Sequence, residues 1–167
     1  VSETSLVLES PSLKIDQGRD SQLESGQPVY AGRRVVGRIV RAGRWMSTVR
    51  RITDPDYRGF AQLVHQTSRG MQFGAQGELE GRGEDQPCRL NRIASTESVR
   101  VGDEVYTAGR DDVLPFPMYY GKVIKVEHRE GEPHWDIEVE PAIRVMENLD
   151  KVQVLRQRLN ADRLLAN

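Results

Sequence analysis

The stretch Gly102-Asp-Glu-Val-Tyr-Thr-Ala-Gly-Arg-Asp-Asp-Val-Leu-Pro-Phe-Pro-Met-Tyr-Tyr-Gly-Lys-Val123 carries the signals of two β-strands and of the corner between them. Val105 and Thr107 alternate with polar residues, which is typical of a strand that is buried on one face. Pro115 and Pro117 fix their own φ angles and favour extended geometry in the residues before them. The stretch therefore predicts a strand, a rigid corner and a second strand after the prolines.

The remainder of the chain has the same character. Fifteen glycines and eight prolines separate short runs rich in valine, isoleucine and tyrosine, which is the pattern of short strands joined by turns. In Trp135–Glu140 apolar and acidic residues alternate, so we expect a strand with one buried face. Val152, Leu155 and Leu159 recur at helical spacing and predict a short helical or disordered tail. We expect about ten to twelve short strands in all, as in small barrels or sandwiches.

The predicted fold class is all-β, with two small β-barrel subdomains. We expect the first barrel over residues 1–66, with the alternative that a late strand within 137–155 completes it. The second barrel is expected over 67–155, and the tail over 156–167. The segment 67–83 holds five glycines and few strand formers, so we expect it to connect the two β units, with the alternative that several of these glycines form tight turns within the second unit.

Composition limits the classes of protein to which the chain can belong. The formal net charge is −1, which by itself favours neither a nucleic acid nor an anionic membrane as partner. No apolar run is long enough to span a membrane, and no signal peptide is evident. The single cysteine, Cys88, excludes an internal disulfide. The sequence starts with Val1, and we expect any targeting or anchoring segment to lie upstream of it.

Candidate catalytic and metal-binding residues are few. No serine lies in a tight turn with glycine on both sides, as an activated nucleophile beside backbone N–H donors would. Cys88 begins an alternating strand, which suits a packed side chain better than a thiolate. His128, His134 and Asp136 could converge across a hairpin, but they lack the spacing of a metal motif. We therefore predict no catalytic residues, no metal and no cofactor.

A basic run is the least ordinary charge feature. Between Arg33 and Thr53 there are seven arginines and no acidic residue, with Tyr30 and Trp45 beside or within the run. Basic strands with aromatic residues bind single-stranded nucleic acid in OB-type barrels, which gives an alternative function. The other interpretations are a solvated face paired with neighbouring acids and a surface that attracts an acidic partner. Arg38, Arg41 and Trp45 are the candidate binding residues of this run.

Several short motifs, in a fixed order, resemble one known family. They are the stretch Leu13–Val29, which ends in Gln27-Pro-Val29, and then Val36-Gly-Arg-Ile-Val40, Ile52-Thr-Asp54, Gly77-Glu-Leu-Glu-Gly81, Val101-Gly-Asp-Glu-Val-Tyr-Thr-Ala-Gly109 and Leu114-Pro-Phe-Pro-Met-Tyr-Tyr-Gly-Lys-Val123. Together they are similar to the rod shape-determining protein MreC family over roughly residues 12–155. The chain departs from the family pattern at Ser21-Gln22, Ala108 and Met118, positions that concern turn geometry.

The resemblance implies a non-enzymatic scaffold of the bacterial cell-wall elongation machinery, which maintains rod cell shape. It implies a periplasmic or extracellular location, with an N-terminal membrane helix and coiled coil that this sequence does not contain. It also implies self-association, as a homodimer or filament, and binding to the elongation penicillin-binding transpeptidase and other proteins of that complex, with no nucleic acid. Phe116, Tyr119 and Tyr120 are then either core residues or anchors of a partner site. Core is the expected role of Phe116, and one of the two tyrosines should be exposed because neighbours on a strand face opposite sides.

Overall fold

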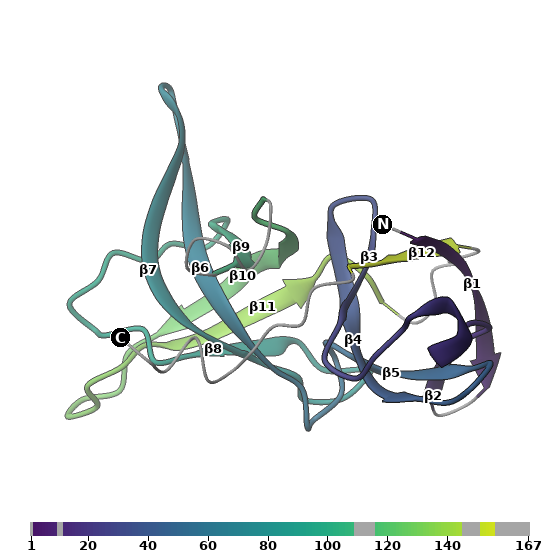
Figure 1. Cartoon of the computed structure of the whole chain (residues 1–167). Helices are drawn as coiled ribbons and strands as arrows, with labels where there is room; N and C mark the ends of the chain where they lie inside the picture. The colour runs from purple at the N-terminus through teal and green to yellow at the C-terminus, as the bar shows by residue number, and fades with distance from the viewer. Residues whose placement is uncertain (1, 10–11, 109–115, 145–150, 156–167) are drawn as a thin grey trace, which may run out of the picture. The chain divides into compact units, whose positions relative to one another are not determined.

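The computed structural model describes residues 2–9, 12–108, 116–144 and 151–155, and the regular secondary structure of these residues is almost entirely β-strand (Figure 1). The strands are β1 (Ser2–Glu9), β2 (Ser12–Ile15), β3 (Pro28–Ala31), β4 (Arg34–Ala42), β5 (Ser47–Arg51), β6 (Arg58–Thr67), β7 (Gly70–Glu80), β8 (Cys88–Asn91), β9 (Glu104–Thr107), β10 (Tyr119–Glu127), β11 (Asp136–Pro141) and β12 (Lys151–Val154). One short 3₁₀-helix, η1, spans Arg19–Ser21. Within these residues, no helix has the length and apolar character needed to cross a membrane. The predicted all-β class is confirmed.

The chain divides into two compact units. The first comprises residues 1–52, 109–116 and 145–167, and the second comprises 53–108 and 117–144. The boundary that we placed after residue 66 lies within β6, whereas the division lies after Ile52. The predicted tail at 156–167 lies outside the described residues.

The first unit is a closed six-stranded antiparallel barrel. Its strands follow one another around the barrel in the order β12-β1-β2-β5-β4-β3, and β3 pairs with β12 to close it. The interior is apolar, with fully or almost fully buried Ile15, Leu23, Val29, Ile39 and Val49. β12 lies within 137–155, where we kept the alternative of a late strand that completes this barrel, although Val152 and Leu155 also fit a helical spacing. It alternates Val152 and Val154 into the core, because β-branched residues at a spacing of two suit a strand between β1 and β3.

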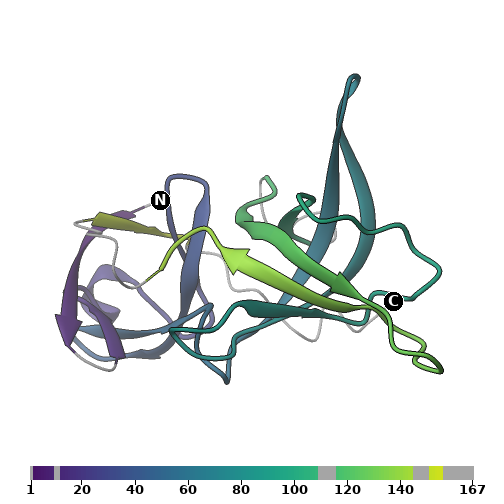
Figure 2. The ribbon, with the colours of Figure 1, turned by 180° about the vertical axis from the view of Figure 1, so that it is seen from behind.

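The second unit is also a closed six-stranded antiparallel barrel. Its order is β6-β7-β8-β11-β10-β9, and β9 pairs with β6 to close it. Leu63, Leu79, Leu90, Val105 and Ile137 are fully buried in its core. β10 and β11 form a hairpin and lie side by side in both ribbon views (Figures 1 and 2).

The two barrels have the same strand order when β12 of the first is matched with β6 of the second. The successive matches are then β1 with β7, β2 with β8, β3 with β9, β4 with β10 and β5 with β11. The strand that comes last along the chain in the first barrel therefore takes the place of the strand that comes first in the second. We found no repeat in the sequence, because the shared feature is topology and not residue identity.

A glycine at the same place in both barrels shows this correspondence in detail. Gly37 on β4 lies between β3 and β5, and a Cβ atom there would be 2.0 Å from the carbonyl oxygen of Arg50. Gly121 on β10 lies between β9 and β11, and a Cβ atom there would be 2.0 Å from the carbonyl oxygen of Glu140. Each barrel thus brings two strands so close at this point that only glycine fits.

The segment 67–83 is not the connection that we predicted. Most of it is β7, the longest of the described strands, which forms a hairpin with β6 through a loop of two residues, Ser68 and Arg69. The far end of this hairpin projects from its barrel as a narrow two-stranded ribbon (Figure 1). Its glycines and glutamines are weak strand formers, so pairing with β6 sets the conformation and not local propensity.

Candidate partner-binding surfaces

A pair of tyrosines lies on the outer wall of the second barrel. Tyr106 on β9 is directly opposite Tyr119 on β10, and their rings are 5.3 Å apart between centroids with an interplanar angle of 45°. Both side chains are half-buried, and Gln62 on β6 lies opposite Tyr106 on its other side. Residues directly opposite each other in a sheet project to the same face. Gln62, Tyr106 and Tyr119 therefore form a row across three strands.

Glu104 adds a negative charge to this row. It accepts hydrogen bonds from the Tyr106 hydroxyl at 3.1 Å and from the Gln66 amide at 3.0 Å. Burial raises the pKa of the Tyr119 phenol, and the nearby Glu104 carboxylate raises it further. Tyr119 is therefore a neutral phenol with an apolar ring. We call Gln62, Glu104, Tyr106 and Tyr119 the tyrosine surface.

Tyr120, the neighbour of Tyr119 in sequence, faces the barrel interior. Its side chain is 2% exposed, and its hydroxyl lies 2.9 Å from the hydroxyl of Tyr57. The two rings meet edge to face with centroids 6.3 Å apart. Tyr120 is thus a core residue, and Tyr119 is the tyrosine that a partner could reach.

Phe116 does not have the core position that we expected. Its side chain is 37% exposed, and the guanidinium of Arg33 lies 5.4 Å from its ring centroid. Both residues belong to the first unit, where Arg33 lies in the β3–β4 turn. The exposed ring is held at the barrel surface by a cation.

The basic candidates lie along β4 and at its far end. Arg38 is half-buried and lies opposite Arg50 of β5, and Arg41 is exposed. Trp45, in the β4–β5 connection, is 67% exposed, and the guanidinium of Arg44 lies 5.0 Å from its ring centroid. We call Arg38, Arg41 and Trp45 the basic surface of the first barrel. Tyr30, which we had considered for base stacking, is only 4% exposed.

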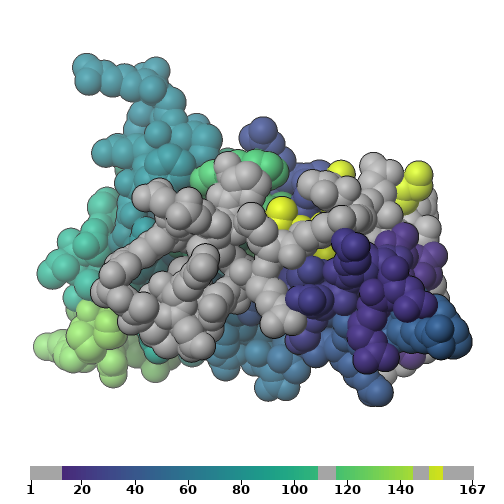
Figure 3. Space-filling view, in the orientation of Figure 1, coloured from purple at the N-terminus to yellow at the C-terminus, as the bar shows by residue number. Residues whose placement is uncertain are grey.

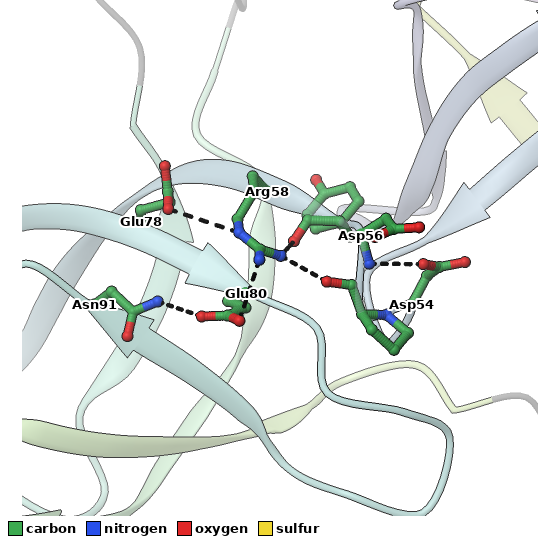
Figure 4. A network of polar contacts seen from close by, with 8 residues as sticks. Asp54, Asp56, Arg58, Glu78, Glu80 and Asn91 are labelled. Carbon is green, nitrogen blue, oxygen red and sulfur yellow. Dashed lines mark hydrogen bonds and ion pairs between the residues drawn. The ribbon is translucent and has the colours of Figure 1, made fainter.

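The acidic and basic side chains around Arg58 hold a turn together. Arg58 forms ion pairs with Glu80 at 3.2 Å and Glu78 at 3.9 Å, and it donates to the backbone oxygens of Pro55 and Tyr57 (Figure 4). Asn91 also donates to Glu80, at 2.6 Å (Figure 4). These bonds connect the turn after β5 to β7 and β8, so the cluster has a structural role.

The histidines that we considered as metal ligands lie at a polar hairpin. His128 Nε2 is 3.0 Å from the backbone oxygen of Glu132, and the His128 ring packs edge to face on Trp135. His134 and Asp136 line a shallow groove of about 260 Å³ together with Arg89, Asn91, Arg129, Glu132 and Trp135. Within the described ranges, no group of three histidine, cysteine or carboxylate side chains could hold a metal ion.

The thiol of Cys88 should be unreactive in the native protein. The side chain is fully buried, and burial raises its pKa to about 12. The reactive thiolate is then roughly one molecule in ten thousand at pH 8. We expect a thiol reagent such as dithiobis-nitrobenzoate to label less than one tenth of the protein over an hour and to label it fully in denaturant. Rapid stoichiometric labelling of the folded protein would contradict this packing.

Tyr106, Gln62 and Glu104 of the tyrosine surface were missed, and Tyr106 is the one that sequence reasoning could have found. The signal was present, because Val105 and Thr107 were predicted to face inward and Tyr106 must then face outward. Its pairing with Tyr119 depends on the register between β9 and β10, which includes an irregularity between Tyr119 and Gly121. That register is not encoded in either strand alone.

Comparison with solved structures identifies the fold. The crystal structure of MreC from Pseudomonas aeruginosa matches with a TM-score of 0.75 and 21% identity, covering 92% of this chain and 97% of that chain. The major periplasmic domain from the cell shape-determining filament MreC matches with a TM-score of 0.70 and 16% identity, covering 92% and 93%. The complex between penicillin-binding protein PBP2 and MreC from Helicobacter pylori gives 0.67 and 13%, covering 95% and 99%.

Comparison of the sequence itself gives the family. No curated protein matches the chain. The family model for rod shape-determining protein MreC, barrel core, matches residues 3–156, which is most of the chain and includes strands of both barrels. The resemblance carried by the ordered motifs is confirmed, and the chain belongs to the rod shape-determining protein MreC family.

Proposed function

We propose that this protein is a non-enzymatic scaffold of the cell-wall elongation machinery, which helps to maintain rod shape by binding wall-synthesis enzymes and copies of itself. Membership in a shape-determining family supports the proposal. So does the relative from Helicobacter pylori, whose structure is a complex with the penicillin-binding protein PBP2. The partner that we propose for this chain is accordingly an elongation transpeptidase.

The proposed location is outside the cytoplasmic membrane. A relative of the same fold is described as a periplasmic domain, which supports this placement. Attachment to the membrane through an N-terminal segment is part of the proposal that rests on the family resemblance alone.

We propose that the transpeptidase binds at the tyrosine surface. Tyr106 and Tyr119 present two touching aromatic rings on a rigid three-stranded wall, with Gln62 and Glu104 as hydrogen-bonding groups beside them. Tyrosine is enriched among the residues that dominate binding energy, because a large ring is buried at a small entropic cost. The wall is held by pairing on both sides, so little order has to be gained on binding.

Alanine substitutions test this site. We expect Tyr106→Ala and Tyr119→Ala each to weaken binding to the extracytoplasmic part of the transpeptidase by about tenfold or more. The matched control is Trp45→Ala, which removes a more exposed aromatic ring from the basic surface of the first barrel. If Trp45→Ala weakens binding and the tyrosine variants do not, the site is not the tyrosine surface.

Nucleic-acid binding by the basic run is not favoured. The family is a shape-determining one, and two of the seven arginines of the run make other contacts in the structure. Arg44 pairs with Asp20 at 3.4 Å and stacks on Trp45, and Arg33 lies over Phe116.

A further inference from the structure

The β6–β7 hairpin has outer edges that no strand covers in the part of the chain that the structure describes. β6 pairs with β9 only over Ala61–Val64, and β7 pairs with β8 only over Glu78–Glu80. The hairpin continues well beyond both pairings, to the loop at Ser68 and Arg69. The space-filling view shows its end standing clear of the barrel (Figure 3). The backbone of the outer half of β7 is therefore open to another strand.

This edge lacks the usual protection against pairing. Natural edge strands carry charges, prolines or inward-facing ionic groups that prevent edge-to-edge association. The segment Gly70–Gly77 has no charged residue and no proline, although 29% of the chain is charged. A register irregularity opposite Gln62–Val64 bends the base of β7, but the segment Gly70–Phe73 beyond it pairs regularly with β6.

Met71 and Phe73 present both free backbone groups and exposed side chains at this edge. Thr67 and Gly70 flank the two-residue loop, and the flanking pair of such a hairpin is a hydrogen-bonded pair. Because hydrogen-bonded and non-hydrogen-bonded pairs alternate, Met71 and Phe73 direct their N–H and C=O groups away from β6. Their side chains are also 46% and 52% exposed.

We propose that this edge of β7 pairs antiparallel with the β7 edge of a second copy of this chain, about a two-fold axis at Gln72. In this register Met71 of each copy lies opposite Phe73 of the other, and the two Gln72 side chains meet at the axis. The outward-directed groups of Met71 and Phe73 then bond to each other, as an antiparallel ladder requires. The product is a continuous ribbon of four strands.

The charge distribution favours a second copy over a different partner. An uncharged segment suffers no like-charge repulsion when it meets itself, and a two-fold contact needs only one self-complementary edge. The nearest charge, Arg69, lies at the tip of the hairpin. In the proposed register the two Arg69 side chains are at opposite ends of the ribbon. A charged partner strand would find no complementary group on the segment Gly70–Gly77.

The association should be weak and reversible. One short strand pair buries much less than the roughly 1,600 Å² of a standard interface, so we expect a dissociation constant on the order of 10–100 µM. This proposal deepens the self-association in the proposed function and rests on it. A scaffold that assembles along a membrane gains avidity from such a weak contact.

Sedimentation velocity over a concentration series tests the proposal. We expect the wild-type chain to dimerise reversibly, and Met71→Lys/Phe73→Lys to raise the dissociation constant by about tenfold or more, because two like charges per copy then meet at the edge. The control Ser68→Lys/Ser98→Lys adds the same charge at exposed positions off this edge and should stay close to wild type.

Disulfide trapping tests the register. The native Cys88 is buried, so a Gln72→Cys variant has one accessible thiol. Residues facing each other in a non-hydrogen-bonded pair are near enough for a disulfide. Gln72→Cys should therefore form a covalent dimer about tenfold faster than Gln66→Cys, which lies on the opposite strand of the hairpin.

Two results would overturn the proposal. One is a wild-type chain that stays monomeric at millimolar concentration. The other is a lysine variant that dimerises as the wild type does. If that variant also no longer binds the transpeptidase, the hairpin belongs to that partner. A lysine variant that is monomeric and still binds the transpeptidase supports the edge pairing and leaves the proposed function intact. Absence of transpeptidase binding by the wild-type chain would contradict the proposed function and would leave the edge pairing unaffected.

Discussion

Gly121→Ala should destabilise the second barrel by about 3 kcal/mol or more. An alanine Cβ at this position would lie 2.0 Å from the carbonyl oxygen of Glu140, 2.9 Å from its carbonyl carbon and 3.1 Å from Cα of Pro141. All three atoms are backbone, so no side chain can rotate away, and β10 and β11 must separate. Separation breaks ladder hydrogen bonds and opens the barrel core at Val123 and Val139.

The measurement is urea unfolding followed by the fluorescence of Trp135, in a Trp45→Phe background so that only the second barrel reports. Gly131→Ala is the matched control. Gly131 has a φ of +84° and no atom near its missing Cβ, so alanine there meets only backbone strain of about 1 kcal/mol. Equal effects of the two substitutions would mean that close strand approach is not what requires glycine. For the same reason, Gly37→Ala should strongly destabilise the first barrel, because an added Cβ atom there would lie 2.0 Å from the carbonyl oxygen of Arg50.

Tyr120→Ala should lower the free energy of unfolding by about 3–5 kcal/mol, whereas Tyr119→Ala should lower it by about 1 kcal/mol or less. Tyr120 fills the core and meets the ring and the hydroxyl of Tyr57, so truncation leaves a large cavity. Tyr119 lies on the outer wall, where water replaces the lost ring. Among folded proteins, Tyr119→Ala should weaken partner binding more than Tyr120→Ala does, because only the Tyr119 side chain can be reached by a partner.

Thermal unfolding and transpeptidase titration of the two variants together provide the test. If Tyr119→Ala stays as stable as expected but binds the transpeptidase weakly, the loss of binding comes from the lost contact and not from unfolding. The Tyr120→Ala variant gives the stability effect of a core tyrosine for comparison. If Tyr119→Ala unfolds as readily as Tyr120→Ala, the outer tyrosine supports the barrel and the binding site must be sought elsewhere.

The sequence predicted the parts of the fold that local patterns specify. The alternation in Trp135–Glu140 predicts β11 almost to the residue, and the stretch 102–123 contains β9 and the start of β10. Strands whose residues alternate between core and solvent can be predicted from the sequence, because burial of one face requires a period of two. The ordered motifs then identified the family.

One element escaped prediction and a second was left open between two alternatives, for physical reasons. β7 has weak strand formers over Gly70–Gly77, and it is a strand because β6 pairs with it along its whole length. β12 contains Val152 and Leu155 at a spacing that also fits a helix, and its place between β1 and β3 depends on contacts far away in sequence.

The candidate site was predicted only in part. Tyr119 could be proposed from the sequence because neighbours on a strand face opposite sides, but which of the two tyrosines is exposed depends on the register of β10. Tyr106 joins Tyr119 only through strand pairing. The hairpin edge could not be predicted at all, since a free edge is defined by the strands that do not pair with it.

The most direct test of the scaffold account is a titration of this chain against the extracytoplasmic part of the elongation transpeptidase from the same organism, measured by interferometry at two salt concentrations. The account predicts saturable binding with little dependence on salt, because the tyrosine surface contributes apolar anchors and one carboxylate. Binding that weakens steeply with salt would contradict the tyrosine surface and indicate the basic surface of the first barrel. No binding at either concentration, with the chain tethered to raise its effective concentration, would contradict the scaffold account itself.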